Sequence, residues 1–448
     1  MAKRTHEFRD PVHVFIRLNS DERKVVDSEP FQRLRHVHQL AMTYLVYPGA
    51  THRRFEHSLG CMELASRIFD TITRPEHTGK LPEDIRGLPD FQDTGALAYW
   101  RKVLRLAALC HDLGHLPFSH AAEELLPAGV THETMTKRFI MEGMADIWAS
   151  LDEPRPEMQQ IAKIAVGEKE AADLPPFTPW ESILSEIITG DIFGADRMDY
   201  LLRDSLHAGV TYGHFDHHRL IDTMRILPGT AKDDTQEHDP EPELGIEYGG
   251  KQVAESLLVA RYLMFSQVYF HPVRRIYDLH LKEFLKASLP GGTYPVDLPR
   301  FVDTTDNEVL ESIRKSARDA NSRGHDHAAR ILKRRHFKKA FHATIQDCKA
   351  NPTILSDLSA ALVEYLGQEN VMSDDLDKKT ASKNDFPIRA DDGRIISAHN
   401  ESGVMTQLPL ATTGYVFVKP ELRDTACRWV KENVENFYTT GGSEECAT

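Results

Sequence analysis

The chain contains 448 residues, of which 54 are Lys or Arg and 68 are Asp or Glu, so its formal net charge is −14. A content of 41% hydrophobic and 27% charged residues is typical of a folded globular protein and excludes a disordered chain. No apolar run approaches the ~20 residues that a membrane span needs, so we expect no membrane partner.

Three further features of the composition narrow the class of protein. The five cysteines are scattered without CxxC spacing, and no apolar segment follows the charged N-terminus, so we expect a cytoplasmic protein. The acidic balance argues against a protein that coats nucleic acid over its whole surface. The 23 histidines raise the expectation of a metal site, because imidazole is a common metal ligand.

Helical periodicity dominates most of the chain. Apolar residues three and four apart predict a helix that begins near Arg53 and further helical segments at 103–110, 161–166, 183–188 and 257–268. Strands with alternating polarity are scarce before residue 380, and no internal repeat is visible. These patterns predict a mainly α fold.

Two segments of opposite charge interrupt the helical pattern. Residues 228–250 carry seven acidic side chains against one Lys, with three Pro and four Gly, and predict an exposed loop or hairpin insertion. Residues 314–339 carry ten Lys or Arg against two Asp, a net charge of +8. We expect a basic helix there, which is either a solvated face or a surface that binds phosphate.

The C-terminal part contains short strand-like pieces at 386–389, 394–396 and 415–418. Asp392 and Gly393 form a hairpin signal between the first two pieces. We therefore expect two domains, which are a helical core over 1–290 and a smaller lobe, first helical and then α+β, over 291–448.

The strongest chemical signal is the stretch ALCHDLGHLPFSH at 108–120. An apolar helix runs into His111 and Asp112, whose imidazole and carboxylate can turn toward one ion near the end of the helix. A glycine and a proline break the helix after this pair, and His115 and His120 follow. Three His and one Asp within ten residues are difficult to explain by packing, because each buried imidazole needs partners.

A catalytic metal needs more ligands than this pair. His57 stands near the start of the helix predicted from Arg53, and Asp196 lies in GDIFGADRMDYLLRDS at 190–205. Two His and two carboxylates would form a mixed nitrogen and oxygen site for a divalent ion such as Mn, Fe, Mg, Ni or Zn. Taken alone, Asp196 is better explained as a helix cap or as a partner of Arg197.

The order of these residues resembles the H…HD…D signature of the HD-domain metal-dependent phosphohydrolases. Further motifs follow at similar spacings, among them EPFQRLRHVHQL at 29–40, YPGATHRRFEHSLG at 47–60 and ADRMDYLLRDSLHAGV at 195–210. Over roughly residues 8–340 the sequence is similar to the deoxynucleoside triphosphate (dNTP) triphosphohydrolases within that group. The resemblance implies an HD-domain helical catalytic core that converts a dNTP to deoxynucleoside and inorganic triphosphate.

The resemblance also implies roles for individual side chains. The metal ligands would be His57, His111, Asp112 and Asp196, and the catalytic group would be His115 and His132 with Glu123 to orient them. The substrate-binding residues would be Gln39, Leu40, Arg54, Arg197, Tyr200, Asp204, His271, Arg275 and Tyr277, the last three with a two-residue offset from the family pattern. Without the resemblance, Glu123 reads as a surface acid and the two tyrosines as core aromatics.

Regulation is a further expectation from the resemblance, because some family members are tetramers that nucleotides activate away from the catalytic site. Asp27, Gln32 and Arg35 match a guanine-reading regulatory site, and Arg335 and Lys339, four apart on the predicted basic helix, could hold a regulatory phosphate. We therefore expect a homo-oligomer, dimer or tetramer, with an activating nucleotide. The stretch DPVHV at 10–14 departs from the family, because it lacks the usual glycine.

Two other functions compete with dNTP hydrolysis. One is an HD phosphohydrolase or nuclease that acts on another phosphate ester, for example single-stranded nucleic acid bound by the basic helix. The other is a regulatory protein that senses nucleotides without turnover. The presence of His115 and His132 counts against the sensor, because a protein without turnover has no need for proton donors.

Overall fold

The computed structural model describes residues 5–79, 81, 85, 87–229, 241–375, 385–408 and 414–438. By its internal contacts the chain forms two compact units. The first comprises Met1–Met264, Pro295–Asn307 and Lys383–Leu408, and the second comprises Phe265–Tyr294, Glu308–Ser382 and Pro409–Thr448. Among the described residues, no helix is both long and apolar enough to cross a membrane.

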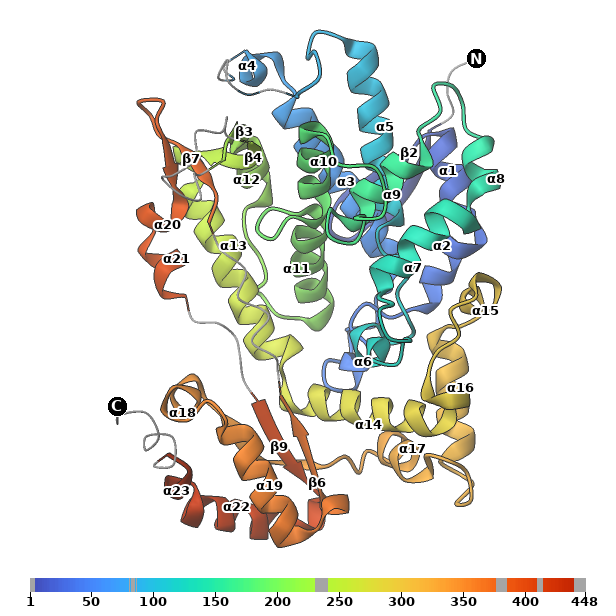
Figure 1. The fold of residues 1–448 in the computed structure, drawn as a ribbon, viewed down its shortest axis with the longest axis vertical. Helices are drawn as coiled ribbons and strands as arrows, with labels where there is room; N and C mark the ends of the chain where they lie inside the picture. Colours follow the sequence, from blue (N-terminus) through green and yellow to red (C-terminus); the bar gives the residue numbers. More distant parts are fainter. Residues whose placement is uncertain are drawn as a thin grey trace, which may run out of the picture. The chain divides into compact units, whose positions relative to one another are not determined.

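The first unit contains most of the helices (Figure 1). They are α1 Ser20–Val26, α2 Glu29–Arg33, α3 Arg54–Ile72, α4 Pro75–Thr78, α5 Thr94–Cys110, α6 His120–Glu123, α7 His132–Arg138, α8 Ala145–Ala149, α9 Met158–Val166, α10 Pro179–Thr189, α11 Ala195–Ala208, α12 His217–Thr223, α13 Lys251–Met264, α15 Leu298–Val302, α20 Ala398–Glu401 and α21 Gly403–Gln407. Its strands are β1 His6–Asp10, β2 Val14–Leu18, β3 Met224–Pro228, β4 Pro242–Glu247, β7 Pro387–Arg389 and β8 Ile395–Ser397.

The second unit is built around one small antiparallel sheet. Its strands β5 Lys338–Ala343, β6 Val371–Asp374 and β9 Gly414–Val418 pair in the order β5-β9-β6. Its helices are α14 Pro272–Ser288, α17 His325–Leu332, α18 Ile345–Ala350, α19 Ile354–Leu366, α22 Arg423–Asn433 and α23 Glu435–Tyr438, and α16 Asp306–Ser316 leads into it from the first unit. The prediction of a mainly α fold with a smaller α+β region is confirmed.

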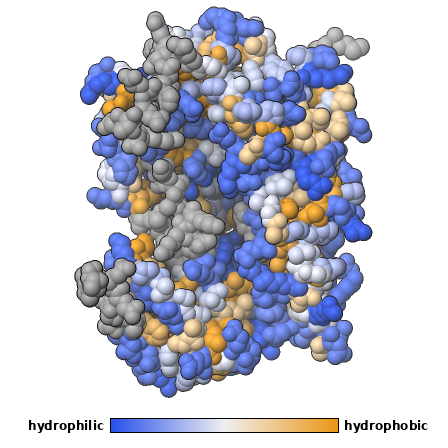
Figure 2. Space-filling view, viewed as in Figure 1, coloured by the Kyte–Doolittle hydropathy of each residue, from blue (hydrophilic) through white to orange (hydrophobic). Residues whose placement is uncertain are grey.

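A buried helix pair forms the centre of the first unit. The apolar run predicted as helix at 103–110 is the C-terminal half of α5, and each of its residues is buried. The helix begins at the cap residue Asp93, whose carboxylate accepts the N–H groups of Gly95 and Ala96. α3 packs against α5 and α11, and α10 packs against α9 (Figure 1). On the face shown in Figure 2, hydrophilic residues dominate and hydrophobic ones form small groups.

Strands before residue 380 are more numerous than the sequence predicts, so that prediction is wrong. β1 and β2 form an antiparallel pair, and β3 and β4 form another. Both pairs escape a search for alternation for physical reasons. β1 and β2 are only five residues long, and β3 (MRILP) buries four consecutive residues, Arg225 among them, so neither its burial nor its polarity alternates over a length that could be recognised.

The acidic segment at 228–250 contains one arm of a hairpin, since β3 pairs with β4 in the register Met224↔Ile246. Residues 230–240 lie outside the described residues. The hairpin alternative of that prediction is confirmed by the antiparallel pairing, whereas the exposed-loop alternative does not hold for β4, in which Leu244 and Ile246 are buried. The composition misleads for β4 because five of the seven acidic residues of this segment precede the strand.

The basic segment at 314–339 is not one helix, which corrects the prediction. α16 ends at Ser316, α17 begins after Gly324, whose φ is 74°, and β5 begins at Lys338. Arg335 lies between α17 and β5, and Lys339 lies within β5, so the two residues do not share a helix face. The left-handed residues Gly324 and Arg334, with φ of 54° at Arg334, break the run at these points.

The predicted C-terminal strands are present, but they join two different sheets. The hairpin around Asp392 and Gly393 is confirmed, because β7 and β8 pair in antiparallel fashion. β7 also pairs in parallel with β4, which places the hairpin in the four-stranded sheet β3-β4-β7-β8 of the first unit. The strand near 415–418 is β9 of the second unit. The division of the chain near residue 290 stays a prediction.

Candidate metal centre and active site

Three elements bring the predicted metal ligands together. His57 lies near the N-terminus of α3, His111 and Asp112 follow the last turn of α5, and Asp196 is the second residue of α11. His57 Nε2 lies 2.9 Å from Asp196 Oδ1 and 3.7 Å from Asp112 Oδ2. The ligand atoms of His57, His111 and Asp196 all lie within 4.8 Å of one another.

The hydrogen bonds of the two imidazoles fit a divalent metal ion. His111 Nδ1 donates to the carbonyl of Ala108 at 2.8 Å, and its buried Nε2 has no hydrogen-bond partner in the described parts of the chain. A neutral imidazole with Nδ1–H carries its lone pair on Nε2, and this atom lies 3.6 Å from Asp196 Oδ1. His57 Nε2 also faces Asp196 Oδ1. Imidazole and carboxylate donors in this arrangement suit Mn, Fe, Ni, Zn or Mg.

Asp199, for which the sequence suggests no role, holds His57 from the side opposite the cluster. Its Oδ2 lies 2.9 Å from His57 Nδ1, and its Oδ1 lies 2.7 Å from His13 Nε2. Arg203 donates to both oxygens, at 2.8 and 2.9 Å. A Cβ on Gly60 would lie 1.9 Å from Asp199 Oδ1, so a glycine is required there. Such a carboxylate fixes the tautomer and orientation of a metal-binding histidine.

Opposing effects set the charges in the cluster. Burial opposes the ionisation of Asp112, yet Arg54 and the neighbouring histidines hold the pKa of this carboxyl well below its ordinary value. Burial likewise opposes ionisation of Asp196, and contacts with His111 and His57 still lower its pKa. Burial lowers the pKa of His57, but the neighbouring carboxylates outweigh burial and raise the pKa to about 10. A divalent cation would therefore displace a proton from the imidazole.

His115 and His132 form a stacked pair beside the cluster, with ring centroids 4.0 Å apart. His115 Nε2 lies 3.1 Å from Asp112 Oδ1, and His132 Nδ1 pairs with Glu123. Burial and then Arg54 lower the pKa of His115 well below its ordinary value. Burial also lowers the pKa of His132, but Glu123 raises it more. The surroundings therefore favour the neutral form of His115 and, by comparison, the protonated form of His132.

Two arginine side chains interact beside the metal cluster, Arg197 on α11 and Arg261 on α13. Arg197 adjoins Asp196, and its buried Nε and Nη1 have no hydrogen-bond partner in the ranges that the structure describes. Burial and then the charge of Arg197 lower the pKa of Arg261, while the nearby Tyr200 raises it. Both arginines are half-buried, and Arg197 Nη2 also lies 3.5 Å from Asp191 Oδ1, so an anion here would satisfy the Nε and Nη1 groups of Arg197. The sequence gives only a weak signal for Arg261, a lone cation in the apolar run LLVARYLM.

The other predicted substrate residues of the first unit lie on three segments. The backbone N–H of Gln39 donates to the carbonyl of His52 at 3.1 Å, and Leu40 beside it is buried. Asp204 Oδ1 lies 2.7 Å from His52 Nε2, so this carboxylate also contacts the segment that follows Leu40. Arg54, the first residue of α3, pairs with Asp112. Their roles in substrate binding stay predictions.

His271, Arg275 and Tyr277 belong to α14 of the second unit. His271 caps the helix by accepting the N–H of Val273, and Arg275 donates to both carboxylate oxygens of Asp374 at 2.7 Å. Tyr277 is fully buried. These contacts give each residue a structural role within the second unit, and their part in substrate binding stays a prediction.

The predicted guanine-reading residues lie where α1 meets α2 and its 3-10 extension. Arg35 Nε donates to Gln32 Oε1 at 2.9 Å, and its guanidinium lies 3.4 Å from the ring centroid of Phe55. Asp27 caps α1 and pairs with Arg23 at 2.6 Å. The structure brings Gln32 and Arg35 into contact, and their regulatory role stays a prediction.

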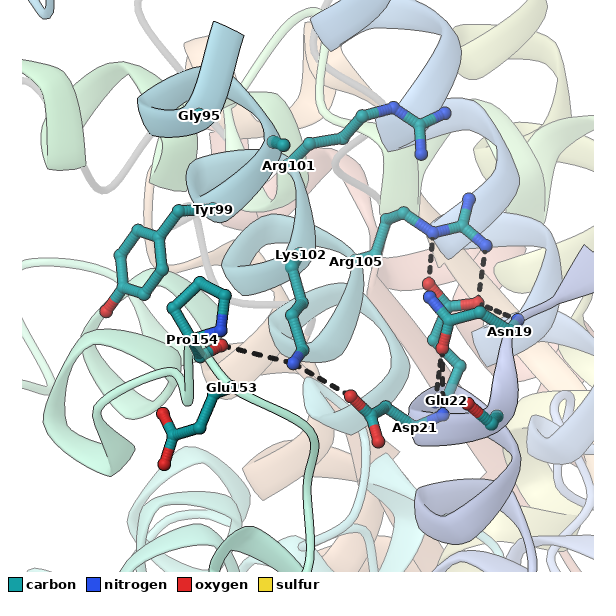
Figure 3. Close-up of a pocket in the computed structure, with 12 residues that line it drawn as sticks. Asn19, Asp21, Glu22, Gly95, Tyr99, Arg101, Lys102, Arg105, Glu153 and Pro154 are labelled. Atoms are coloured by element: carbon teal, nitrogen blue, oxygen red, sulfur yellow. Dashed lines mark hydrogen bonds and ion pairs between the residues drawn. The ribbon is translucent and has the colours of Figure 1, made fainter. Parts of the chain in front are cut away.

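A pocket of about 420 Å³ opens between α1 and α5 (Figure 3). Its basic side chains already have acidic partners. Lys102 lies 2.8 Å from Asp21, and Arg105 pairs with Glu22. The acidic and basic side chains that line this pocket are equal in number, so its lining carries no excess positive charge for a polyphosphate.

The sequence matches the HD domain over residues 54–175 and the HD associated region over residues 215–365. It is 38% identical over 274 residues to an uncharacterised protein of Methanocaldococcus jannaschii, covering 61% of this chain and 48% of that protein. It is 27% identical over 372 residues to a human deoxynucleoside triphosphate triphosphohydrolase, covering 74% of this chain and 54% of that protein. The chain thus spans about half the length of these curated relatives.

Solved structures extend the similarity to nearly the whole chain. A hypothetical protein from Aquifex aeolicus has a TM-score of 0.75 and 33% identity, with 95% of this chain and 99% of that chain covered. A phosphohydrolase from Bacteroides thetaiotaomicron has a TM-score of 0.67 at 22% identity, with coverages of 92% and 99%, and at this identity the likeness concerns the fold alone.

Proposed function

Because the chain belongs to the HD-domain family, we propose that His57, His111, Asp112 and Asp196 bind a divalent metal ion at the centre of a phosphohydrolase. The observation that carries the proposal is the buried Nε2 of His111, which faces two carboxylates and lacks a hydrogen-bond partner in the described residues. A bound metal ion would lower the pKa of a water molecule and so supply a nucleophile near neutral pH.

We propose a dNTP as the substrate and inorganic triphosphate as one product. Arg197 and Arg261 support a polyphosphate, because they place two cations close together and leave buried donors of Arg197 without partners among the described residues. The relatives described as deoxynucleoside triphosphate triphosphohydrolases support the same substrate class. Gln39 and Leu40 would contact the sugar, and Tyr200 would line the phosphate site.

The stacked histidines suit the departure of the nucleoside. Hydrolysis at the α-phosphorus breaks the bond to the 5′ oxygen, and this oxygen needs a proton as it leaves. His132 would supply that proton, because Glu123 favours its charged ring, and the contacting His115 lies between His132 and Asp112. Asp112 contacts His115 through one carboxylate oxygen and Arg54 through the other. Arg54 would neutralise negative charge on the phosphates of the substrate.

Product analysis tests the proposal. The protein would be incubated with each dNTP, each NTP and a single-stranded oligonucleotide in the presence of Mg, Mn or Fe, and the products would be separated. We expect deoxynucleoside and inorganic triphosphate from a dNTP. Release of a different product would assign another ester, and the absence of turnover with all substrates and metals would reject the phosphohydrolase.

A matched pair of histidine variants locates the chemistry. His111→Gln should abolish turnover and metal binding, because it removes the atom proposed to bind the metal. His399→Gln changes an exposed histidine of α20 and should leave both unchanged. The same assay with added GTP, together with sedimentation analysis, tests the proposals of nucleotide activation and of a dimer or tetramer.

A further inference from the structure

The loop that follows His115 contains two consecutive left-handed residues that are not glycine. Phe118 has a φ of 57°, and Ser119 has a φ of 55° with a ψ of −128°. Residues with a Cβ adopt such conformations at a cost, and they persist only where the surrounding structure holds them in place. Both side chains are buried, so the restraint must come from groups packed against this turn.

Asp306 supplies the restraint on one side of the turn. Its Oδ1 accepts the N–H of Phe118 at 2.8 Å, and its Oδ2 accepts the N–H of His38 at 2.8 Å and also pairs with the His38 ring. The His38 ring lies nearly parallel to that of Phe118, at an angle of 11° and a centroid distance of 6.0 Å. Asp306 is only 1% exposed, so its carboxylate depends on these partners.

Arg33 ties the same two segments together at a second point. Its Nε donates to the carbonyl of Thr304 at 3.0 Å, and its Nη2 donates to the carbonyl of His115 at 2.8 Å. Its guanidinium lies 4.8 Å from the ring centroid of Phe301. Asp306 therefore holds the loop at Phe118, and Arg33 links residues 301–306 to its other end at His115.

The strained turn delivers one hydroxyl group to the proposed phosphate site. Ser119 Oγ accepts a hydrogen bond from Arg54 Nε at 2.9 Å and donates to the carbonyl of His38 at 3.3 Å. Arg54 in turn pairs with Asp112. The position of the Arg54 guanidinium therefore depends on a serine whose own backbone is held by Asp306.

We propose that Ser119 is a positioning residue that orients Arg54 for phosphate binding, and that Asp306 and Arg33 brace the turn that presents it. The inference rests on the proposed function, because Arg54 is assigned to the substrate there. It adds a role for residues 301–306, which lie far in sequence from the metal ligands and contact none of the proposed ligands directly among the described interactions.

Ser119→Gly separates positioning from folding. Glycine adopts the conformation of residue 119 freely, so the variant should melt at the same temperature as the wild type or higher. It lacks the hydroxyl, so kcat/KM for a dNTP should fall roughly tenfold or more, the effect expected for a lost hydrogen bond to a charged group. Ser119→Ala should lose the same activity while keeping the strain, and so should melt below Ser119→Gly. Full activity in Ser119→Gly would overturn the proposal.

Asp306→Asn tests the brace against a matched control. Glu22 is a carboxylate of the same 1% exposure that pairs with Arg105, so Glu22→Gln should destabilise the protein without changing kcat/KM at a temperature where it remains folded. Asp306→Asn should lower kcat/KM beyond the control at the same fraction folded. Equal kinetic effects of the two variants would assign Asp306 a merely structural role.

A readout without turnover distinguishes this inference from the proposed function. Hydrogen exchange of the Arg54 Nε–H, followed by NMR in protein with labelled arginine, should be slow in the wild type and faster in Ser119→Gly. Unchanged exchange would refute the positioning role. If the wild type releases no triphosphate while this exchange behaves as expected, the proposed substrate fails and the contact between Ser119 and Arg54 stands.

Discussion

Asp199→Asn tests whether the carboxylate behind His57 sustains metal binding. The substitution keeps the shape of the side chain but removes the charge that faces His57 Nδ1, His13 Nε2 and the Arg203 guanidinium. Loss of a carboxylate that orients a metal-binding histidine typically weakens metal affinity by about 10- to 100-fold. Since each factor of ten corresponds to about 1.4 kcal/mol, the metal site should lose roughly 1.4–2.8 kcal/mol of binding free energy.

The same substitution also destabilises the fold, and this effect needs its own control. Arg203 is fully buried and contacts only Asp199 and Asp10 among the acidic side chains described, so removal of one partner should cost about 3–5 kcal/mol of unfolding free energy. Asp10→Asn removes the other partner of Arg203 without touching His57. It should destabilise the protein comparably and leave Mn affinity unchanged.

Calorimetric titration of the metal-free proteins with Mn, together with thermal melting, gives both quantities. We expect Asp199→Asn to lower the melting temperature and the Mn affinity, and Asp10→Asn to lower the melting temperature alone. Wild-type Mn affinity in Asp199→Asn would refute the reasoning. So would an equal loss of affinity in Asp10→Asn, because the effect would then follow from general destabilisation.

Three further predictions concern stability. Burial and the neighbouring Glu243 raise the pKa of Glu186 to about 7. The folded protein therefore binds this proton more tightly than the unfolded chain, and the free energy of unfolding should fall by roughly 3 kcal/mol as the pH rises from 4.5 to 7. Urea unfolding of Glu186→Gln should show a flatter pH dependence, and an unchanged dependence would contradict this reasoning. Val14→Gly should raise the free energy of unfolding by about 1 kcal/mol, because Val14 has a φ of 68°, and a loss of stability in denaturant would count against the strain. Gly60→Ala should cost about 3 kcal/mol and perturb Asp199, whereas Gly403→Ala, with open space at its Cβ, should melt like the wild type.

The helical core and the grouping of the predicted metal ligands could be anticipated because both depend on local patterns. The run at 103–110 is apolar at consecutive helical positions, and the break after it leaves His111 and Asp112 at the end of the helix. His57 near the start of one helix and Asp196 near the start of another are also short-range features. That these residues meet in space depends on tertiary packing, which no local pattern predicts. The resemblance to the HD-domain family is what predicted it.

The wrong predictions have a different cause. The composition of a segment is an average over all the helices, turns and strands that the segment contains. The charge of residues 314–339 predicts a helix face, yet the turn at Gly324 and the strand β5 divide the run, and Lys339 belongs to a strand. Arg261 and Asp199 escape notice for a related reason, since a single polar residue in a helix acquires meaning only from what packs against it. Asp199 contacts His13, 186 positions away in the chain, and no local pattern predicts that pair.

α11 shows why these residues act together. Asp196 faces the metal cluster, Arg197 faces the proposed phosphate site, and Asp199 reaches His57 one turn further on. Positions three and four apart lie on one face of a helix, so Asp196, Asp199 and Arg203 form one charged stripe along α11. A small rotation of this helix would move a metal ligand, its supporting carboxylate and a phosphate-binding cation at once. Arg203 on the same stripe also pairs with Asp10 on β1, so the N-terminal hairpin packs against the helix that carries Asp196 without contributing a ligand.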